Sequence, residues 1–237
     1  MYRMLPIILA SALTVSAYAD ETTVSKWKGE AELGYLRTSG NTDTESLHVS
    51  GKVVNERDKW RHTGTVESIV KDENGVNTAN KFYVTGKSDY SINKRSYLFV
   101  FLTYENDHFS GYDYQAGASF GYGYHLIKTE TQKLDLEAGV GARKSRTDAG
   151  DTTTEGIVRG AGNYEWKISK TATFLQTLAV ESGKDSTVTR STTALKTQVA
   201  GNLSAKFALN VKHASQVPAG FKNTDTETIV TLVYNFE

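Results

Sequence analysis

The stretch 114–125 decides the fold class. It reads Tyr-Gln-Ala-Gly-Ala-Ser-Phe-Gly-Tyr-Gly-Tyr-His, with an aromatic residue or alanine at every even position. Gln, Gly, Ser or His stands at every odd position between them. A helix would scatter this aromatic row around its axis, whereas a strand places the whole row on one face. The stretch therefore predicts a β-strand with one apolar face and one small or polar face.

The same alternation recurs along the chain. Apolar residues stand at alternate positions from 134 to 142, and Lys133, Asp135, Glu137 and Arg143 belong to the opposite strand face. The last residues, 228–236, repeat the apolar alternation. Three of the predicted strands, 60–70, 171–182 and 191–202, alternate poorly and are predicted from their length and flanking residues. Altogether we predict strands at 26–38, 44–56, 60–70, 79–91, 96–105, 113–125, 132–144, 154–166, 171–182, 191–202, 206–216 and 226–236.

The lengths of the strands and connections predict a membrane barrel. Most strands are about 11 to 13 residues long, which suits a tilted membrane-spanning strand rather than the shorter strands of soluble sheets. Tight connections are predicted at 57–59, 92–95, 167–170 and 203–205, and longer ones at 71–78, 106–112, 145–153, 183–190 and 217–225. Outer-membrane barrels have short periplasmic turns and longer outer loops, a trend that the short 39–43 and long 126–131 connections break. We expect a single closed antiparallel transmembrane β-barrel of the all-β class with about 12 strands; a soluble periplasmic β protein is the alternative.

The first residues predict export. Arg3 precedes an apolar run at 5–15, and Ala17-Tyr-Ala19 provides small residues at a cleavage site. This order is typical of a secretory signal peptide. We therefore predict a signal peptide at 1–19 and an outer-membrane β-barrel at 20–237, located in the bacterial cell outer membrane. The absence of cysteine is compatible with passage through an oxidising periplasm.

The tryptophans predict an aromatic girdle. Trp27, Trp60 and Trp166 lie at strand ends that would all face the periplasm, where such girdles are found in outer-membrane barrels. Three Trp residues in the core of a β-sandwich are the alternative interpretation. The other aromatic residues predicted at this level are Tyr90, Tyr97, Tyr124, Tyr164, Tyr234 and Phe236.

The inward face of the barrel is predicted to carry charges of both signs. Twelve strands lie between small barrels filled by side chains and large barrels with an aqueous channel. The lumen is therefore either a narrow pore for small polar solutes or a salt-bridged plug. Inward glycines at 117, 121, 123, 139 and 141 predict empty space or close backbone approach. The lumen candidates are Lys28, Glu30, Glu32, Lys87, Asp89, Asp135, Glu137, Arg143, Arg159 and Glu165, joined by Lys52, Arg61, Glu67, Lys81, Lys133, Glu155, Lys196, Lys212 and Glu227.

The sequence gives little support for a catalytic, cofactor-binding, metal-binding or nucleic-acid-binding site. The chain contains no familiar nucleotide-binding or hydrolase motif, and its five histidines lack ligand spacing, so we expect no catalytic residue, cofactor or metal. The chain has 27 basic and 27 acidic residues, and this balance gives no indication of a broad basic surface that would bind nucleic acid.

Two surface features leave alternatives open. His213 and Ser215 share an outward strand face and resemble the His-x-Ser pair of outer-membrane phospholipases. The Asn that orients the pair in those enzymes has no match here; Thr226 and Thr228 are the nearest residues, and neither is the usual orienting residue. Lipid hydrolysis is therefore one alternative, and a His and Ser at head-group level is the other. Acidic loop residues could bind divalent cations that bridge lipopolysaccharide, or simply be solvated; they lie at 71–73, 105–107, 148 and 151.

The segment Ser39-Gly-Asn-Thr-Asp-Thr-Glu-Ser46, following the strand residues 32–35, resembles a bacterial family of salt-induced outer membrane proteins with a domain of unknown function. Residues 27–30 and 232–236 also resemble it, and the match covers nearly all of 26–237. The resemblance implies a stress-related outer-membrane barrel without an established activity. Its expected partners are outer-membrane lipid and lipopolysaccharide, and the barrel-assembly machinery and periplasmic chaperones during biogenesis. Such proteins usually end on an aromatic residue, whereas this chain ends on Glu237 after Phe236.

Overall fold

The computed structural model describes residues 26–38 and 44–236. The predicted signal peptide at 1–19, most of the family-like segment, at 39–43, and Glu237 lie outside the described residues. Among those described, no helix is long and apolar enough to cross a membrane.

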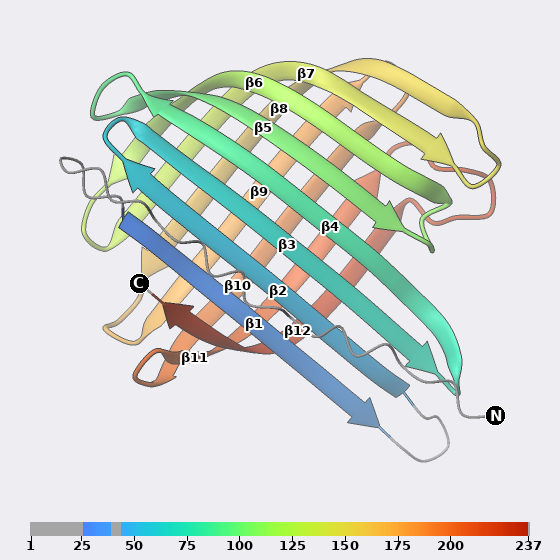
Figure 1. Cartoon of the computed structure of the whole chain (residues 1–237), viewed down its shortest axis with the longest axis horizontal. Coiled ribbons are helices and arrows are strands. Elements are labelled where there is room, and N and C mark those ends of the chain that lie inside the picture. The colour runs from blue at the N-terminus through green and yellow to red at the C-terminus, as the bar shows by residue number, and fades with distance from the viewer. Residues whose placement is uncertain (1–25, 39–43, 237) are drawn as a thin grey trace, which may run out of the picture.

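The described residues form an antiparallel barrel in which each strand pairs with the next and β1 closes against β12 (Figure 1). This confirms the predicted fold class. The strands are β1 (Lys26–Thr38), β2 (Thr44–Arg57), β3 (Trp60–Glu73), β4 (Val76–Ser91), β5 (Ser96–Asp107), β6 (Tyr112–Lys128), β7 (Gln132–Thr147), β8 (Thr152–Lys167), β9 (Ala172–Gly183), β10 (Thr187–Ala200), β11 (Leu203–Ala214) and β12 (Thr224–Phe236).

The barrel has two ends. At the end that we call the terminal end, β1 begins and β12 finishes, and the turns at 58–59, 92–95, 129–131, 168–171 and 201–202 lie there (Figure 1). The opposite end, called the loop end, carries the described connections at 74–75, 108–111, 148–151, 184–186 and 215–223. The predicted contrast between short and long connections is wrong for most of them, because the strands continue further toward the loop end than the sequence pattern indicates. Only 215–223 is a long connection in the described part of the chain.

Two predicted boundaries are corrected with a clear physical reason. The predicted loop 71–78 is a continuation of β3 and β4 around a tight turn at Asn74 and Gly75, whose φ angles are 51° and 77°. Asn-Gly with positive φ at both positions is the preferred two-residue hairpin turn. The predicted turn at 203–205 is replaced by one at Gly201 and Asn202, where Gly201 has a φ of 50°.

The two faces of the barrel differ in polarity, in the reverse sense to a soluble protein. Outward side chains such as Leu98, Val100 and Leu102 are each about half exposed, at 50%, 51% and 53%. The most buried polar residues include Glu105, Glu137 and Arg143, which as whole residues are only 3–5% exposed. An apolar exterior around a polar interior is the arrangement of a barrel in a membrane, because hydrocarbon then contacts apolar atoms and the polar groups find partners inside.

One wall of the interior carries aromatic rings. Tyr97 and Phe99 of β5 are 4% and 2% exposed, and β5 pairs with β6 so that they lie beside Gly123 and Gly121. The ring of Tyr97 occupies the place where a Cβ of Gly123 would stand. The prediction of Tyr97 in the aromatic girdle is therefore wrong. The predicted close approach at the inward glycines is confirmed at Gly123.

Candidate functional site: the charged lumen and its mouth

The strand registers and the pattern of burial place the predicted lumen residues on the inward face. Lys28 follows the outward Trp27, and inward Glu165 pairs with Lys133 near the terminal end. Burial varies greatly along this face: the side chains of Lys133 and Glu165 are 52% and 36% exposed, whereas that of Glu137 is only 1% exposed. The terminal end is thus open to water, and the middle of the lumen is packed.

Glu137 of β7 organises the packed middle. Its carboxylate accepts from Arg159 Nη1 at 2.8 Å and from the Tyr97 hydroxyl at 2.9 Å. Lys87 Nζ lies 2.6 Å from both Glu137 and Asp89. Strands β4, β5, β7 and β8 therefore meet through one carboxylate. Its burial is compensated by two cations and one hydroxyl, as a buried charge requires.

The two cations of this cluster also rest on the inward aromatic rings. The Arg159 guanidinium lies 4.7 Å from the ring centroid of Phe101 and 5.5 Å from that of Phe99. Lys87 Nζ lies 4.9 Å from the centroid of the Tyr97 ring. Ring faces attract cations, so the aromatic wall fixes the position of both basic groups.

Glu181 of β9 connects this cluster to the loop end. Its carboxylate lies 3.8 Å from both Arg159 and Arg190, and 4.0 Å from Arg143. Arg143 in turn donates to Glu155 Oε1 at 2.6 Å. The alternating charges continue from the mouth of the barrel into its middle. Glu181 was missed because the predicted strand 171–182 alternates poorly.

A second set of contacts crosses the lumen. Glu105 of β5 is 3% exposed, and its carboxylate accepts from Arg190 of β10 at 2.7 Å and from Lys212 of β11. Strands β6 to β9 separate β5 from β10, so these contacts join facing walls. We call Glu105, Arg190 and Lys212 the cross-lumen bridge. The prediction of a loop cation site at 105–107 is wrong for Glu105, which lies within β5 and faces inward. Arg190 was missed because 183–190 was predicted to be a loop.

Further ion pairs support the closure between β1 and β12. Lys196 of β10 donates to Glu30 at 2.8 Å, and Lys206 of β11 donates to Glu32 at 2.8 Å. Both lysines reach across β12 to β1. Elsewhere on the inward face, His125 contacts Asp135 at 2.6 Å. A small cavity of about 110 Å³ lies beside Glu32 and Lys206.

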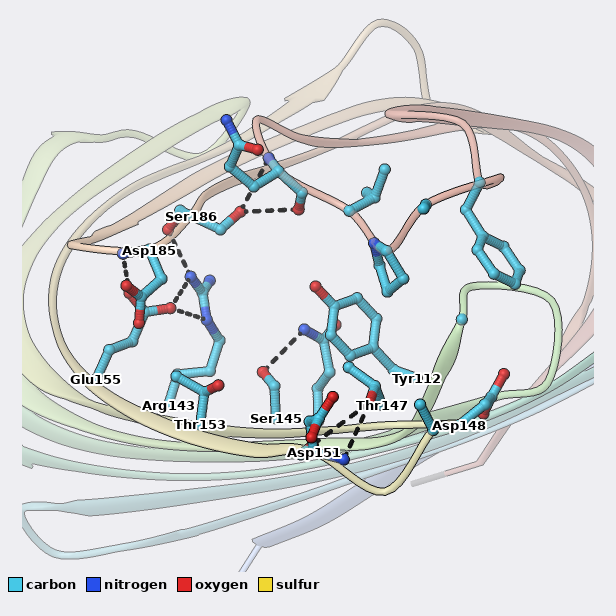
Figure 2. A pocket seen from close by; sticks show the side chains of 18 residues that line it. Tyr112, Arg143, Ser145, Thr147, Asp148, Asp151, Thr153, Glu155, Asp185 and Ser186 are labelled. Atoms are coloured by element: carbon cyan, nitrogen blue, oxygen red, sulfur yellow. Dashed lines mark hydrogen bonds and ion pairs between the residues drawn. The ribbon is translucent and has the colours of Figure 1, made fainter.

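A cavity opens at the loop end. It has a volume of about 630 Å³ and lies between the ends of β6, β7 and β8 and the connections 148–151, 184–186 and 215–223. Figure 2 shows Arg143 and Glu155 at one side of this space and Tyr112 across from them. Its side chains are those of Tyr112, Gln115, Arg143, Ser145, Thr147, Asp148, Ala149, Asp151, Thr153, Glu155, Asp185, Ser186, Gln216, Val217, Pro218, Ala219 and Phe221. We call it the mouth cavity.

The His213 and Ser215 pair has other partners. His213 Nδ1 lies 2.8 Å from the Thr224 hydroxyl, and Ser215 Oγ accepts from the backbone N–H of Thr187 at 2.9 Å. These bonds hold the ends of the 215–223 connection, and they give the pair no support as base and nucleophile. Within 26–38 and 44–236, no group of three or more His, Asp or Glu side chains is placed to hold a metal ion.

The aromatic residues predicted for the girdle, Tyr97 excepted, lie near the terminal end and point outward. Trp27 is 60% exposed, Trp60 47% and Trp166 40%. Trp60 also packs against Tyr90, with ring centroids 5.0 Å apart. The remaining members at this level are Tyr124, Tyr164, Tyr234 and Phe236.

Comparison with solved structures shows the likeness of the fold. The NanC porin matches with a TM-score of 0.54 at 14% identity, covering 88% of this chain and 100% of that one. An outer membrane channel from Pseudomonas putida F1 matches with a TM-score of 0.50 at 9% identity, covering 92% and 97%. The chain is therefore a porin-like β-barrel in its fold.

Comparison by sequence shows the family. The chain is 25% identical over 212 residues to the uncharacterized protein YdiY of Escherichia coli K12, covering 88% of this chain and 83% of that protein. The model of a family described as "Protein of unknown function, DUF481" matches residues 31–236, which include most of every strand. The chain therefore belongs to the DUF481 family.

Proposed function

We propose that the protein is an outer-membrane barrel whose lumen is a narrow, water-filled path for small ions and polar solutes. The observation that carries this proposal is the cross-lumen bridge, which joins facing walls of a lumen lined by both signs of charge. Rings of charged side chains are a common means of selecting ions in pores. The bridge occupies part of the space between the walls and would narrow the path. Larger solutes would therefore be excluded, and only small hydrated ions would pass.

Location and partners form part of the same proposal. A cleaved signal peptide at 1–19 would send the chain to the outer membrane, with the terminal end in the periplasm and the loop end outside. The outward aromatic residues near the terminal end support a membrane interface at that level, because such residues favour the boundary between lipid and water. Lipid and lipopolysaccharide would surround the barrel, and periplasmic chaperones and the assembly machinery would insert it. The family resemblance adds a stress-related role, which an increase in protein level at high salt would support.

Charge substitutions in the bridge test the pore. Glu105→Gln leaves Arg190 and Lys212 without their shared carboxylate, so we expect preference for anions to increase. Arg190→Gln leaves less positive charge beside Glu105, so we expect the ion preference of the pore to shift toward cations. The measurement is the reversal potential of the refolded chain 20–237 in a planar bilayer under a potassium chloride gradient. Glu165→Gln is the matched control, because it removes a charge at the open terminal end and should shift the potential much less.

A plugged barrel that presents its loops is the second candidate. Its support is the tight packing of the middle, where the Glu137 and Arg159 side chains are only 1% and 6% exposed. A folded protein that stays silent, and remains so after both bridge substitutions, would contradict the pore and favour the plug. Opposite shifts in reversal potential for Glu105→Gln and Arg190→Gln would contradict the plug.

A further inference from the structure

The mouth cavity is held in shape by bonds between its connections. The Asp148 N–H donates to the carbonyl of Gly111 at 3.1 Å, which joins two neighbouring connections. The Ser186 hydroxyl donates to the carbonyl of Gln216 at 3.3 Å, and this joins the long connection to 184–186. Phe221 fills the space beside Gly111, where a Cβ would come within 2.7 Å of the Phe221 ring. A cavity fixed in this way needs little rearrangement to receive a ligand.

One side of the cavity carries a buried basic group, Arg143. The Arg143 side chain is 6% exposed, and Nη2 donates to Glu155 at 2.6 Å and to the Ser186 carbonyl at 2.5 Å. Its Nη1 is buried without a hydrogen-bond acceptor and lies 4.0 Å from Glu181. A buried N–H without an acceptor is costly, so this side of the cavity would gain from a ligand oxygen that reaches Nη1 through a small movement of the side chain.

The walls add both apolar surface and hydrogen-bonding groups. Tyr112, Pro218 and Phe221 supply ring surfaces, and Gln115 and Ser145 supply an amide and a hydroxyl. Figure 2 shows the Tyr112 ring and the Arg143 side chain on opposite sides of the same space. The walls therefore suit a ligand with apolar faces and polar edges.

The charge of the lining selects against an anionic ligand. Four carboxylates line the cavity, whereas Arg143 is its single basic side chain. The carboxylates accept hydrogen bonds from hydroxyl groups and repel other anions. They are those of Asp148, Asp151, Glu155 and Asp185.

We propose that the mouth cavity binds a neutral saccharide, with the ring surfaces of Tyr112 and Phe221 against the sugar, the carboxylates accepting from its hydroxyls and Arg143 Nη1 donating to one of its oxygens. A volume of about 630 Å³ lies within the usual range for small-ligand sites. This binding is independent of ion conduction, since it needs the loop-end cavity and not an open lumen.

Titration with sucrose and maltose tests the proposal. The refolded chain 20–237 is placed in amine-oxide micelles, because a maltoside detergent would compete, and binding is followed by saturation-transfer NMR. We expect saturable binding of at least one disaccharide, weakened about tenfold in Phe221→Ala, as loss of an aromatic contact predicts. Phe109→Ala is the matched control, because Phe109 lies in the neighbouring 108–111 connection outside the cavity lining. Its affinity should equal that of the unchanged protein.

Further probes identify the ligand class and its source. Galacturonate should bind more weakly than the neutral sugars because of the carboxylates, and spermidine should not compete. If purified lipopolysaccharide competes with the disaccharide, the membrane glycan is a source of the saccharide ligand. If lipopolysaccharide does not compete, the ligand is a free saccharide. The absence of binding by both disaccharides, an unchanged affinity in Phe221→Ala, or displacement by spermidine would each overturn the proposal. Every variant is first checked for folding by its mobility on an unheated gel.

Discussion

At the scale of single residues, Gly123 and Tyr97 illustrate how the interior is packed. The Tyr97 ring stands in the space beside Gly123, and its hydroxyl donates to Glu137 at 2.9 Å. The glycine therefore allows an aromatic ring to lie flat against the inner wall and to reach a buried carboxylate. Overpacking a filled interior typically costs about 1–3 kcal/mol.

Substitution of this glycine gives a residue-scale prediction. Gly123→Ala should displace the Tyr97 ring, break its bond to Glu137 and lower the free energy of unfolding by about 1–3 kcal/mol. Gly160→Ala is the control, because nothing lies within 4 Å of a Cβ at Gly160. The midpoint of urea unfolding in lipid vesicles measures both. Equal midpoints for the two variants would contradict the packing described for Tyr97.

At the scale of elements, the closure between β1 and β12 is short. β1 pairs with β2 from Lys26 to Thr38, but with β12 only from Gly29 to Leu33. Glu32, near the end of this short pairing, accepts from Lys206 at 2.8 Å and from the Thr231 hydroxyl at 3.2 Å. Side-chain bonds therefore reinforce a strand pair whose backbone pairing is short.

Hydrogen exchange tests the closure. Glu32→Gln weakens the contacts with Lys206 and Thr231, so backbone amides of β1 and β12 should exchange about tenfold faster or more, while those of β6 and β7 stay unchanged. Mass spectrometry of the exchanging protein resolves these strands. Glu165→Gln provides the comparison, since its partner Lys133 is half exposed and such pairs contribute little. A uniform increase in all strands would indicate global destabilisation instead.

The elements also show which parts of the structure could be predicted from sequence. Strands with an apolar outward face, such as β6 and β7, alternate clearly, so their existence and inward residues were predicted. β10 was poorly located because its outward face carries hydroxyl residues such as Thr189, Ser191 and Thr193, which do not contrast with a polar interior. In β5, Tyr97 to Leu102 is apolar on both faces, so the pattern could not distinguish inward from outward.

Contacts across the lumen could not be predicted from the sequence, for a different reason. Arg190 and Glu105 are 85 positions apart and belong to strands that do not pair. Alternation assigns a face to each residue, but it does not give the shape of the barrel section or the residue opposite. The mouth cavity depends on the path of 215–223, for which the sequence offers no comparable pattern.

At the scale of the whole molecule, a closed barrel leaves no unpaired strand edge. Every described strand has two neighbours, so partial unfolding must break hydrogen bonds on both sides of a strand. We expect the refolded chain 20–237 to migrate faster on an unheated dodecyl sulfate gel than after boiling, because the barrel stays compact in the detergent. Identical mobility before and after boiling would contradict a membrane barrel and favour the soluble alternative.

The tight turns at the loop end have a consequence for how the protein meets other macromolecules. A protease or an antibody needs accessible, deformable chain, and most connections there, such as Asn74 and Gly75, offer almost none. The connection 215–223 is the exception among those described, and it is tied to 184–186 through Ser186 and Gln216. If this end faces outward on cells, the basic residues that external trypsin would meet in the described loop-end connections are Lys222 and, in the three-residue turn 184–186, Lys184. We expect cleavage at Lys222 first, because its connection is the longer one.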